Sequence, residues 1–196
     1  MPPKTRFSQE EIINAAFEVV RSGGMDALSA RSIARQLNAS TQPIYSYLKS
    51  MKDLKEKITE KAFALLLSYE TQKHTGHAGT DRSINNVLFA KKEFHVWRFL
   101  YDPRNHSLVS PFFEKRLADV VKEMDSYEGR LSREDKEKYF YIVWFFLYGL
   151  SSTINNIYSK CEKETKAMFS NDESITQFVI ESIQSIWTGF KQTHEK

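Results

Sequence analysis

Apolar residues recur along most of this chain at the spacing of an α-helix, and no stretch shows the strict alternation typical of a β-strand. The first such pattern begins at Ser8, which together with Glu11 forms the S-x-x-E signature of a helix start. Two consecutive glycines, Gly23 and Gly24, stop it. The pattern therefore predicts an all-α protein, with a first helix between these two signals.

Residues 29–54 contain two short helical patterns on either side of a three-residue turn. Ser29 can cap the first helix with its hydroxyl, and Asn38 tolerates the left-handed backbone that ends a helix. Ser40 can cap the second helix, and Pro43 falls in its first turn, where the missing N–H costs no internal bond. This layout predicts a helix-turn-helix, whose second helix lies in the major groove of DNA. The alternative is a helical hairpin whose outer face is only solvated.

The polar residues outside the apolar stripe suit contacts with DNA. Thr41 and Gln42 come at the start of the second helix, where a glutamine can pair with adenine and a threonine can touch a thymine methyl. Tyrosines and lysines further along carry hydroxyls and charges of the kind that hold phosphates. A short basic arm before the first helix is either a groove contact or a disordered tail. The candidate DNA-binding residues are Lys4, Arg6, Ser29, Arg31, Ser40, Thr41, Gln42, Tyr45, Tyr47, Lys49 and Lys52.

A set of residues between about Phe7 and Leu54 has a specific order and spacing: Ile12, Ala15, Ala16, Gly23, Gly24, Leu28, the segment 29–37, Ser40, Thr41, Ile44, Tyr45, Tyr47, Leu48, Asp53 and Leu54. In this order and spacing the stretch resembles the TetR family of transcriptional regulators. One position departs from the family pattern, because Met51 stands where a lysine is usual, and Lys49 or Lys52 would have to supply that phosphate contact. The resemblance implies an N-terminal three-helix bundle at residues 1–54, joined to a larger helical domain for effector binding and dimerisation at residues 55–196.

Composition and charge agree with a DNA-binding protein. The chain has 196 residues, of which 41% are hydrophobic, enough for a substantial core. Residues 1–52 hold seven Lys or Arg against four Asp or Glu, so the net charge of +3 lies with the helix-turn-helix, where phosphates require it. The single cysteine, Cys161, excludes an internal disulfide. The longest apolar run, 139–150, is shorter than the roughly 20 residues of a membrane span, and no signal region is seen, so we expect a soluble cytoplasmic protein without membrane contact.

Beyond residue 54 the pattern predicts helices only. Pro103 breaks one of them, and Pro111 suits the first position of another. The loop expected at 74–81 contains His74 and His77, but no cysteine or carboxylate cluster accompanies them, so no metal site is expected. The expected helices cover residues 52–73, 83–101, 111–127, 132–160 and 172–192, with a short helical turn at 105–110.

The helix expected at 132–160 is apolar nearly all round in its middle, so it must be buried on more than one side. The last helix carries an apolar stripe of the same kind. Two such helices from each of two chains would form a four-helix interface, as the resemblance also implies, and the alternative is an ordinary monomer core. The candidate dimer contacts are Ile154, Ile175, Phe178, Val179, Ile183, Ile186, Trp187 and Phe190.

Large rings with few polar atoms gather in the helices between residues 89 and 148. A pocket lined by them would suit an apolar or aromatic small molecule, and the resemblance implies an inducer pocket here, although the rings could equally form plain core. His95, Arg98 and His106 either orient a polar group or lie at the surface. The candidate pocket residues are Phe89, Phe94, Trp97, Phe112, Phe113, Trp144, Phe145 and Tyr148, with Phe99 beside them.

No glycine-rich phosphate loop, G-x-S-x-G or paired His/Cys set supports catalysis, so we expect neither an enzyme nor a cofactor. The sequence predicts a homodimeric DNA-binding regulator, a repressor released from a near-palindromic double-stranded operator by a small hydrophobic or aromatic effector. The alternatives are a ligand-independent helical interaction protein and, more remotely, an all-helical enzyme.

Overall fold

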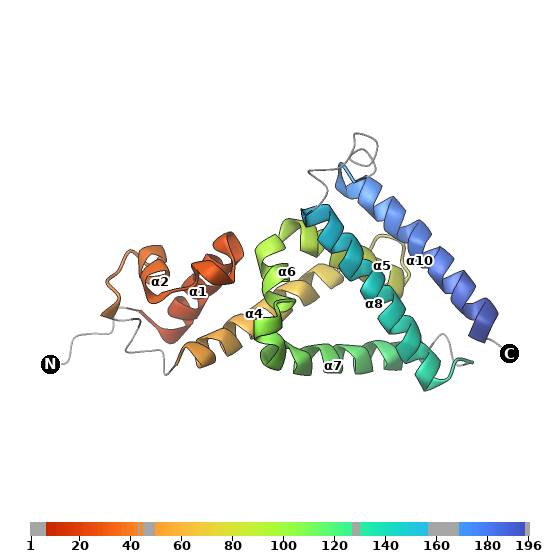
Figure 1. Ribbon diagram of the computed structural model, residues 1–196, viewed down its shortest axis with the longest axis horizontal. Coiled ribbons are helices and arrows are strands. Elements are labelled where there is room, and N and C mark those ends of the chain that lie inside the picture. Colours follow the sequence, from red (N-terminus) through yellow and green to blue (C-terminus); the bar gives the residue numbers. More distant parts are fainter. Residues whose placement is uncertain (1–6, 43, 45–49, 127–129, 157–168, 195–196) are drawn as a thin grey trace. The chain divides into compact units, whose positions relative to one another are not determined.

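The structure is a computed structural model that describes residues 7–42, 44, 50–126, 130–156 and 169–194 (Figure 1). Every regular element in these ranges is helical, which confirms the all-α prediction. Within the same ranges, no helix is long and apolar enough to cross a bilayer. The elements are α1 (Gln9–Gly23), η1 (Met25–Ala27), α2 (Ala30–Gln36), α4 (Met51–Glu70), α5 (Ala78–Lys92), α6 (Phe94–Leu100), η2 (Pro103–Asn105), α7 (His106–Met124), α8 (Arg133–Asn156) and α10 (Asp172–His194).

The chain folds into two compact units, and neither is a continuous stretch of sequence. The first unit comprises Met1–Leu65 and Glu93–Ser110, and the second comprises Leu66–Lys92 and Pro111–Lys196. The first unit is therefore larger than residues 1–54. It is larger because α4 continues beyond residue 54 and because the segment that contains α6 packs on α1.

Local interactions fix both ends of α1. The Ser8 hydroxyl accepts a hydrogen bond from the Glu11 N–H at 3.2 Å, and the Glu11 carboxylate accepts one from the Ser8 N–H at 2.7 Å. This reciprocal capping box confirms the predicted start, and the Ser8 donors hold the pKa of Glu11 below its ordinary value. At the other end Gly24 adopts φ 77°, a left-handed conformation that is cheap only for glycine.

The segment 93–110 joins the first unit through the end of α1. Glu93 is only 6% exposed and accepts two hydrogen bonds from Arg21, one from Nε at 2.7 Å and one from Nη2 at 2.6 Å. This bidentate pair raises the pKa of Arg21 above its already high ordinary value. Next to it, a Cβ atom at Gly24 would lie 3.2 Å from Nδ1 of His95, so the glycine also permits the close approach of α6.

The prediction of one helix over residues 83–101 is wrong, because α5 ends at Lys92 and α6 begins at Phe94. Glu93 lies between them with φ −116° and ψ 45°, outside the helical region. No glycine or proline marks this break. Its side chain is held by Arg21, 72 residues earlier, so the break accompanies a tertiary contact that helical periodicity does not record.

We expect the variants Arg21→Gln and Glu93→Gln, made singly and together, to show a coupling of about 1 kcal/mol in the free energy of unfolding. The coupling is modest because the Arg21 side chain is 42% exposed, so solvent screens the pair. Urea titrations of the four proteins measure it. Glu18 lies 3.6 Å from the same guanidinium but is 47% exposed, so Glu18→Gln is the matched control and should be nearly neutral. Strictly additive effects of the first two changes would contradict the role given to the pair.

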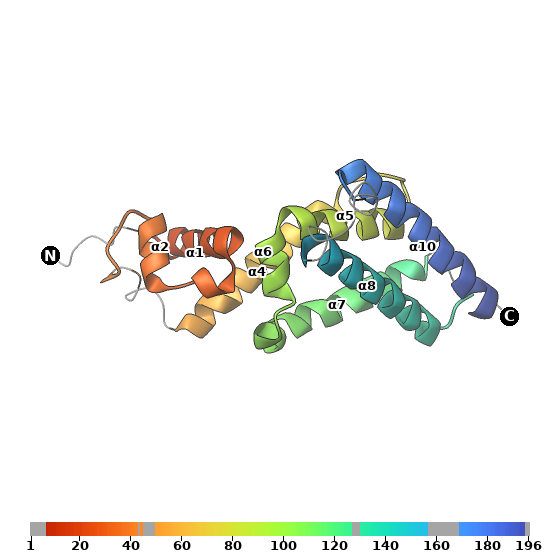
Figure 2. The same cartoon turned by 45° about the horizontal axis from the view of Figure 1, so that its top comes forward.

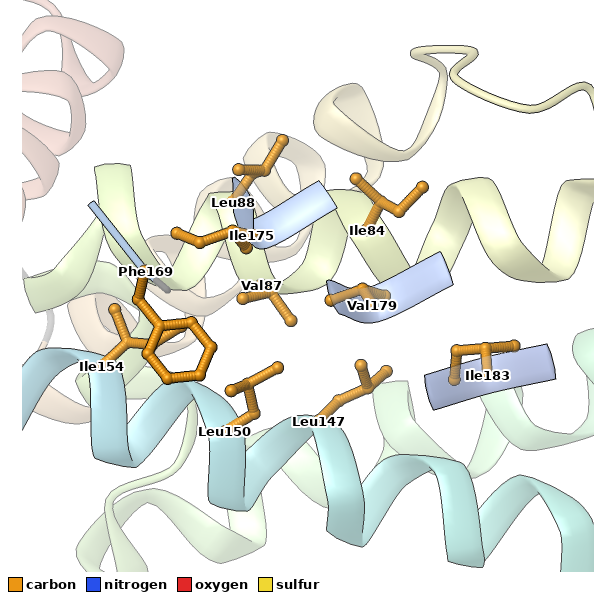
Figure 3. Close-up of a cluster of buried hydrophobic side chains, with 10 residues drawn as sticks. All are labelled: Ile84, Val87, Leu88, Leu147, Leu150, Ile154, Phe169, Ile175, Val179 and Ile183. Carbon is orange, nitrogen blue, oxygen red and sulfur yellow. The ribbon is translucent and has the colours of Figure 1, made fainter. Parts of the chain in front are cut away.

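The core of the second unit lies among α5, α8 and α10, which run side by side in Figures 1 and 2. Figure 3 shows Val87 of α5, Leu147 of α8 and Val179 of α10 in the middle of this core. Burial of these apolar faces is the main stabilising contribution that the unit offers. The cluster consists of Ile84, Val87, Leu88, Leu147, Leu150, Ile154, Phe169, Ile175, Val179 and Ile183.

Two further helix starts differ from the prediction. The loop expected at 74–81 is shorter, because α5 begins at Ala78, and Asp81 in its first turn accepts hydrogen bonds from the N–H groups of Thr75 and Gly76. The sequence places Pro111 at the start of a helix, whereas the structure has it inside α7, which begins at His106 directly after η2. Near a helix start the proline removes a single backbone bond, which α7 tolerates.

The starts of α8 and α10 agree with the prediction. The Ser132 hydroxyl accepts a hydrogen bond from the Asp135 N–H at 3.1 Å, ahead of α8. The Asn171 side chain accepts one from the Ser174 N–H at 2.8 Å, ahead of α10. Both are side-chain caps that satisfy N–H groups left unpaired by the helix itself.

Candidate nucleic-acid interface

The first helix of the helix-turn-helix, α2, is held at its start by two serines. The Ser29 hydroxyl accepts a hydrogen bond from the Ser32 N–H at 3.1 Å, and the Ser32 hydroxyl accepts one from the Ser29 N–H at 2.9 Å. The Ser32 hydroxyl also donates to the Ala27 carbonyl at 2.7 Å, which ties α2 to η1. The predicted cap at Ser29 is confirmed, while Ile33 and Ala34 turn into the core of the first unit.

The turn after α2 follows the Schellman pattern. The Ala39 N–H donates to the Ala34 carbonyl at 2.8 Å, and the Asn38 N–H donates to the Arg35 carbonyl at 3.1 Å. Asn38 between them has φ 49°, and it is the non-glycine residue with positive φ among the described residues. This confirms the predicted left-handed turn residue. The turn sets the direction in which the following segment, from Ser40 onward, leaves α2.

The second helix of the motif is described only at its start. Gln42 and Ile44 are helical, and the Ile44 N–H donates to the Thr41 carbonyl at 3.1 Å. Ile44 is fully buried, whereas Gln42 is exposed and Thr41 half-exposed. The buried isoleucine therefore fixes which side of this helix faces the protein and leaves the predicted base-contacting side chains facing outward. The candidates Lys4, Arg6, Tyr45, Tyr47 and Lys49 lie outside the described residues.

Basic side chains surround this start. Arg31 and Arg35 are exposed on α2, and neither has an ion-pair partner in the described part of the chain. Lys52 is exposed in the first turn of α4, beside Met51, which is 43% exposed. Unpaired surface cations of this kind suit phosphate contacts. Sequence reasoning missed Arg35, although its position one helical turn after Arg31 places both on one face of α2.

The eight ring residues proposed as a pocket are spread over both units. Phe94 and Trp97 belong to the first unit and stack on each other in α6, with ring centroids 6.5 Å apart. Phe89 of the second unit is 1% exposed, and Phe113 contacts Trp144 with centroids 6.2 Å apart. Two other candidates lie at the surface: Phe145 is 62% exposed and Tyr148 is 41% exposed. Phe112 is half-buried on α7.

Most of the residues proposed for a dimer interface are already covered by the chain itself. Ile154, Ile175, Val179, Ile183 and Phe190 are each less than 10% exposed, and the first four belong to the α5–α8–α10 core. They are covered because α5 occupies the side of α8 and α10 that the sequence suggested for a partner.

The remaining three residues of that set are half-buried, and two of them contact rings of α8 in the same chain. Phe178 stacks on Phe146 with centroids 6.5 Å apart, and Trp187 meets Tyr139 edge-on at 4.7 Å. Ile186 is half-buried on α10. The buried part of the α10 stripe, Ile175, Val179, Ile183 and Phe190, therefore lies in the interior of the second unit.

A different face of α8 carries the exposed apolar surface, which we call the α8 face. It consists of Tyr141, Ile142, Phe145 and Tyr148, each more than 40% exposed and spaced to lie on one side of the helix. The Phe145 ring lies 6.2 Å from that of Tyr141 and 5.2 Å from that of Trp144. Stacked exposed rings of this size are uncommon on a soluble monomer.

The two loop histidines serve local structure. His74 Nε2 lies 2.8 Å from the Asn85 side-chain oxygen, and His77 Nδ1 lies 3.3 Å from the Thr80 hydroxyl. Within the described ranges, no group of three or more His, Cys, Asp or Glu side chains is arranged to hold a metal ion.

Comparison with known proteins agrees with this geometry. Residues 12–58 match the family described as bacterial regulatory proteins of the tetR family. No curated protein matches the chain. The solved structure of a transcriptional regulator from Rhodococcus sp. Rha1 is similar, with a TM-score of 0.67 and 14% identity, over 93% of this chain and 97% of that one. At that identity the likeness shows the fold.

Proposed function

We propose that this chain, a TetR-family transcriptional regulator, acts as a homodimeric repressor that leaves its operator when a small molecule binds the second unit. One observation carries the DNA-binding part. Within the region that matches the family, a capped α2 and a Schellman turn present the exposed Gln42 next to the buried Ile44.

In this proposal Thr41 and Gln42 contact base edges, since glutamine offers the donor and acceptor pair that adenine presents in the major groove. Arg31, Arg35 and Lys52 hold phosphates on either side and position the helix without reading sequence. The sequence-based candidates Tyr45, Tyr47, Lys49, Lys4, Arg6, Ser29 and Ser40 would complete the contact surface. Lys52, which is exposed next to Met51, supplies the phosphate contact that a lysine at position 51 would make.

Dimerisation through the α8 face is the second part of the proposal. Four exposed apolar residues on one side of a helix form the kind of surface that a second copy of the chain would cover. A two-fold dimer would present two copies of the helix-turn-helix and would favour a near-palindromic operator. Four of the eight sequence-based dimer residues, Ile154, Ile175, Val179 and Ile183, lie in the core of the second unit, so the proposal moves the interface to the α8 face.

Release by an effector requires that the effector bind the DNA-free conformation more tightly than the DNA-bound one. The half-buried rings of α7 and α8, among them Phe113 and Trp144, are the sequence-based candidates for contact with an apolar effector. Operator occupancy then falls as effector concentration rises. A transcription assay on the bound promoter separates a repressor, whose release raises transcription, from an activator, whose release lowers it.

We expect Gln42→Ala to weaken binding to the cognate operator by roughly 1–3 kcal/mol and to relax the preference at one base position. Operator fragments are first selected from genomic DNA by gel shift. Fluorescence anisotropy with single-base variants of the selected site then measures the loss. Gln36→Ala is the matched control, because Gln36 is an exposed glutamine at the end of α2, six residues earlier. Unchanged affinity and unchanged base preference for Gln42→Ala would overturn the placement of the DNA-contacting helix.

The same gel shift distinguishes the alternative functions. A regulator shifts a discrete genomic fragment, and its affinity falls steeply with salt as phosphate contacts release counterions. A helical interaction protein or an all-helical enzyme shifts no fragment selectively. Arg35→Gln tests the electrostatic contribution: it should weaken binding to all sequences alike and lower the salt slope by about one.

A further inference from the structure

The second unit contains a cavity of about 460 Å³ that no part of the proposed DNA-binding function uses. It lies where the last turn of α4, the 71–77 loop, the first turns of α5 and the middle of α7 meet. This volume falls within the range of roughly 300–1,000 Å³ that is typical of small-molecule sites. None of the eight candidate pocket rings lines it, so its ligand has to be inferred from polar chemistry.

Two arginines from different helices dominate the lining. Arg82 of α5 and Arg116 of α7 have side chains that are 19% and 22% exposed. Each is held by one carboxylate through its Nη2 atom, Arg82 by Glu123 and Arg116 by Glu70. The other two nitrogens of each guanidinium have no hydrogen-bond partner among the described residues. Since a guanidinium carries five N–H donors, both side chains retain unused donors at the cavity.

The carboxylates that line the cavity do not accept hydrogen bonds from these unused arginine donors. Oδ1 of Asp81 accepts hydrogen bonds from the N–H and the hydroxyl of Thr75, both at 2.7 Å, and Oδ2 accepts one from the Gly76 N–H at 3.2 Å. Burial raises the pKa of Asp81, but these hydrogen bonds outweigh it, so the pKa lies below its ordinary value. Asp81 is therefore an ionised group engaged by its own loop, and Glu70 is engaged by Arg116.

Each arginine has one carboxylate partner, Glu123 for Arg82 and Glu70 for Arg116, so unused donors, and not a missing counter-charge, remain at the cavity. Burial lowers the pKa of Arg116, and the opposing attraction of Glu123 and Asp119 does not restore it. A half-buried cation in this state gains from a second anionic partner.

From these observations we propose that the cavity binds a small organic acid, whose carboxylate lies between Arg82 and Arg116. The planar fork of arginine matches a carboxylate with two parallel hydrogen bonds. Leu67, which is 48% exposed on α4, offers an apolar surface for the body of the ligand. The cavity exceeds what an inorganic anion needs, which favours an acid with a compact hydrocarbon part. This site concerns the second unit alone and does not depend on the proposed DNA-binding function.

The proposal is tested by isothermal titration calorimetry of the full-length protein at constant ionic strength. The probes are benzoate, neutral benzamide, cationic benzylamine and inorganic phosphate. We expect benzoate to bind at least tenfold more tightly than benzamide, phosphate to bind more weakly than benzoate, and benzylamine not to bind. Equal affinity for benzoate and benzamide would overturn the proposal, and so would tighter binding of phosphate than of benzoate.

Two variants locate the site. Arg82→Gln removes one of the two guanidinium groups, and Leu67→Glu places a carboxylate at an exposed position of the lining without disturbing the core. Both should reduce benzoate affinity at least tenfold. Arg133→Gln is the matched control, because Arg133 is an 80% exposed arginine of the same unit that pairs with Glu137, and it should bind benzoate as the wild type does. Benzoate binding that survives both Arg82→Gln and Leu67→Glu would place the acid elsewhere and overturn the proposal. Leu67→Glu decides the matter alone if Arg82→Gln does not fold.

Discussion

Replacing Phe145 by glutamate is expected to convert the protein from a dimer into a monomer at micromolar concentration. Phe145 is 62% exposed at the centre of the α8 face, with Tyr141 and Tyr148 on either side of it. In a two-fold interface each chain would bury one unpaired carboxylate, at a cost of several kcal/mol for the pair. Light scattering should then report the mass of one chain, 22.9 kDa, instead of twice that value.

The same substitution should also lower operator affinity steeply, although it lies in the second unit and alters no residue of the helix-turn-helix. The affinity falls because a monomer binds one half-site, and the binding energy of the second half-site is lost. Leu67→Glu is the matched control: it places the same charge on another exposed apolar residue, on α4, and should leave the mass at the dimer value. A wild-type protein with the mass of one chain and intact operator binding would contradict the dimer, and an unchanged mass for Phe145→Glu would contradict this interface.

Ile183→Ala is expected to destabilise the second unit by about 2–5 kcal/mol, because it removes three buried methyl or methylene groups and leaves a cavity. Ile183 is 5% exposed and packs in the α5–α8–α10 core shown in Figure 3. Urea unfolding followed by circular dichroism measures the loss. Gln184→Ala, an exposed neighbour on the same helix, is the control and should change stability by less than about 0.5 kcal/mol.

This variant also separates a core position from an interface position. If Ile183 lies in the core of one chain, the loss of stability is the same at every protein concentration, and the dimer persists while the chain is folded. If Ile183 lay between two chains, the variant would dissociate at low concentration and the folded monomer would keep its stability. Light scattering over a dilution series, run beside the urea titrations, distinguishes the two outcomes.

The local features of the fold could be predicted from the sequence because each depends on residues a few positions apart. The structure confirms three such features: the capping box of Ser8 and Glu11, the cap that Ser29 provides for α2, and the left-handed backbone at Asn38. They are also the features that define the helix-turn-helix. This explains why a motif of some 50 residues was recognisable while the rest of the chain was not.

Features that depend on distant residues could not be predicted in this way. The break at Glu93 accompanies a pair with Arg21, and nothing in the flanking sequence signals it. The stripe on α10 correctly indicated burial, but periodicity cannot tell whether α5 of the same chain or a second chain covers it. The charged cavity follows from the meeting of α4, α5 and α7, so no single segment carries its pattern.

Because the first unit consists of two separate segments of the chain, it cannot be completed until the second of them has been synthesised. A ribosome releases α1, α2 and the first part of α4 before it has made Glu93, and α5, which belongs to the second unit, comes between them. Until residue 100 has been made, the end of α1 lacks the complete α6, and until residue 93 has been made, Arg21 lacks its carboxylate partner. The loop of 72 residues that this contact closes adds an entropic cost that grows only slowly with length. The helices of the helix-turn-helix are thus made before the segment that completes their unit, and α5 of the second unit is made between the two.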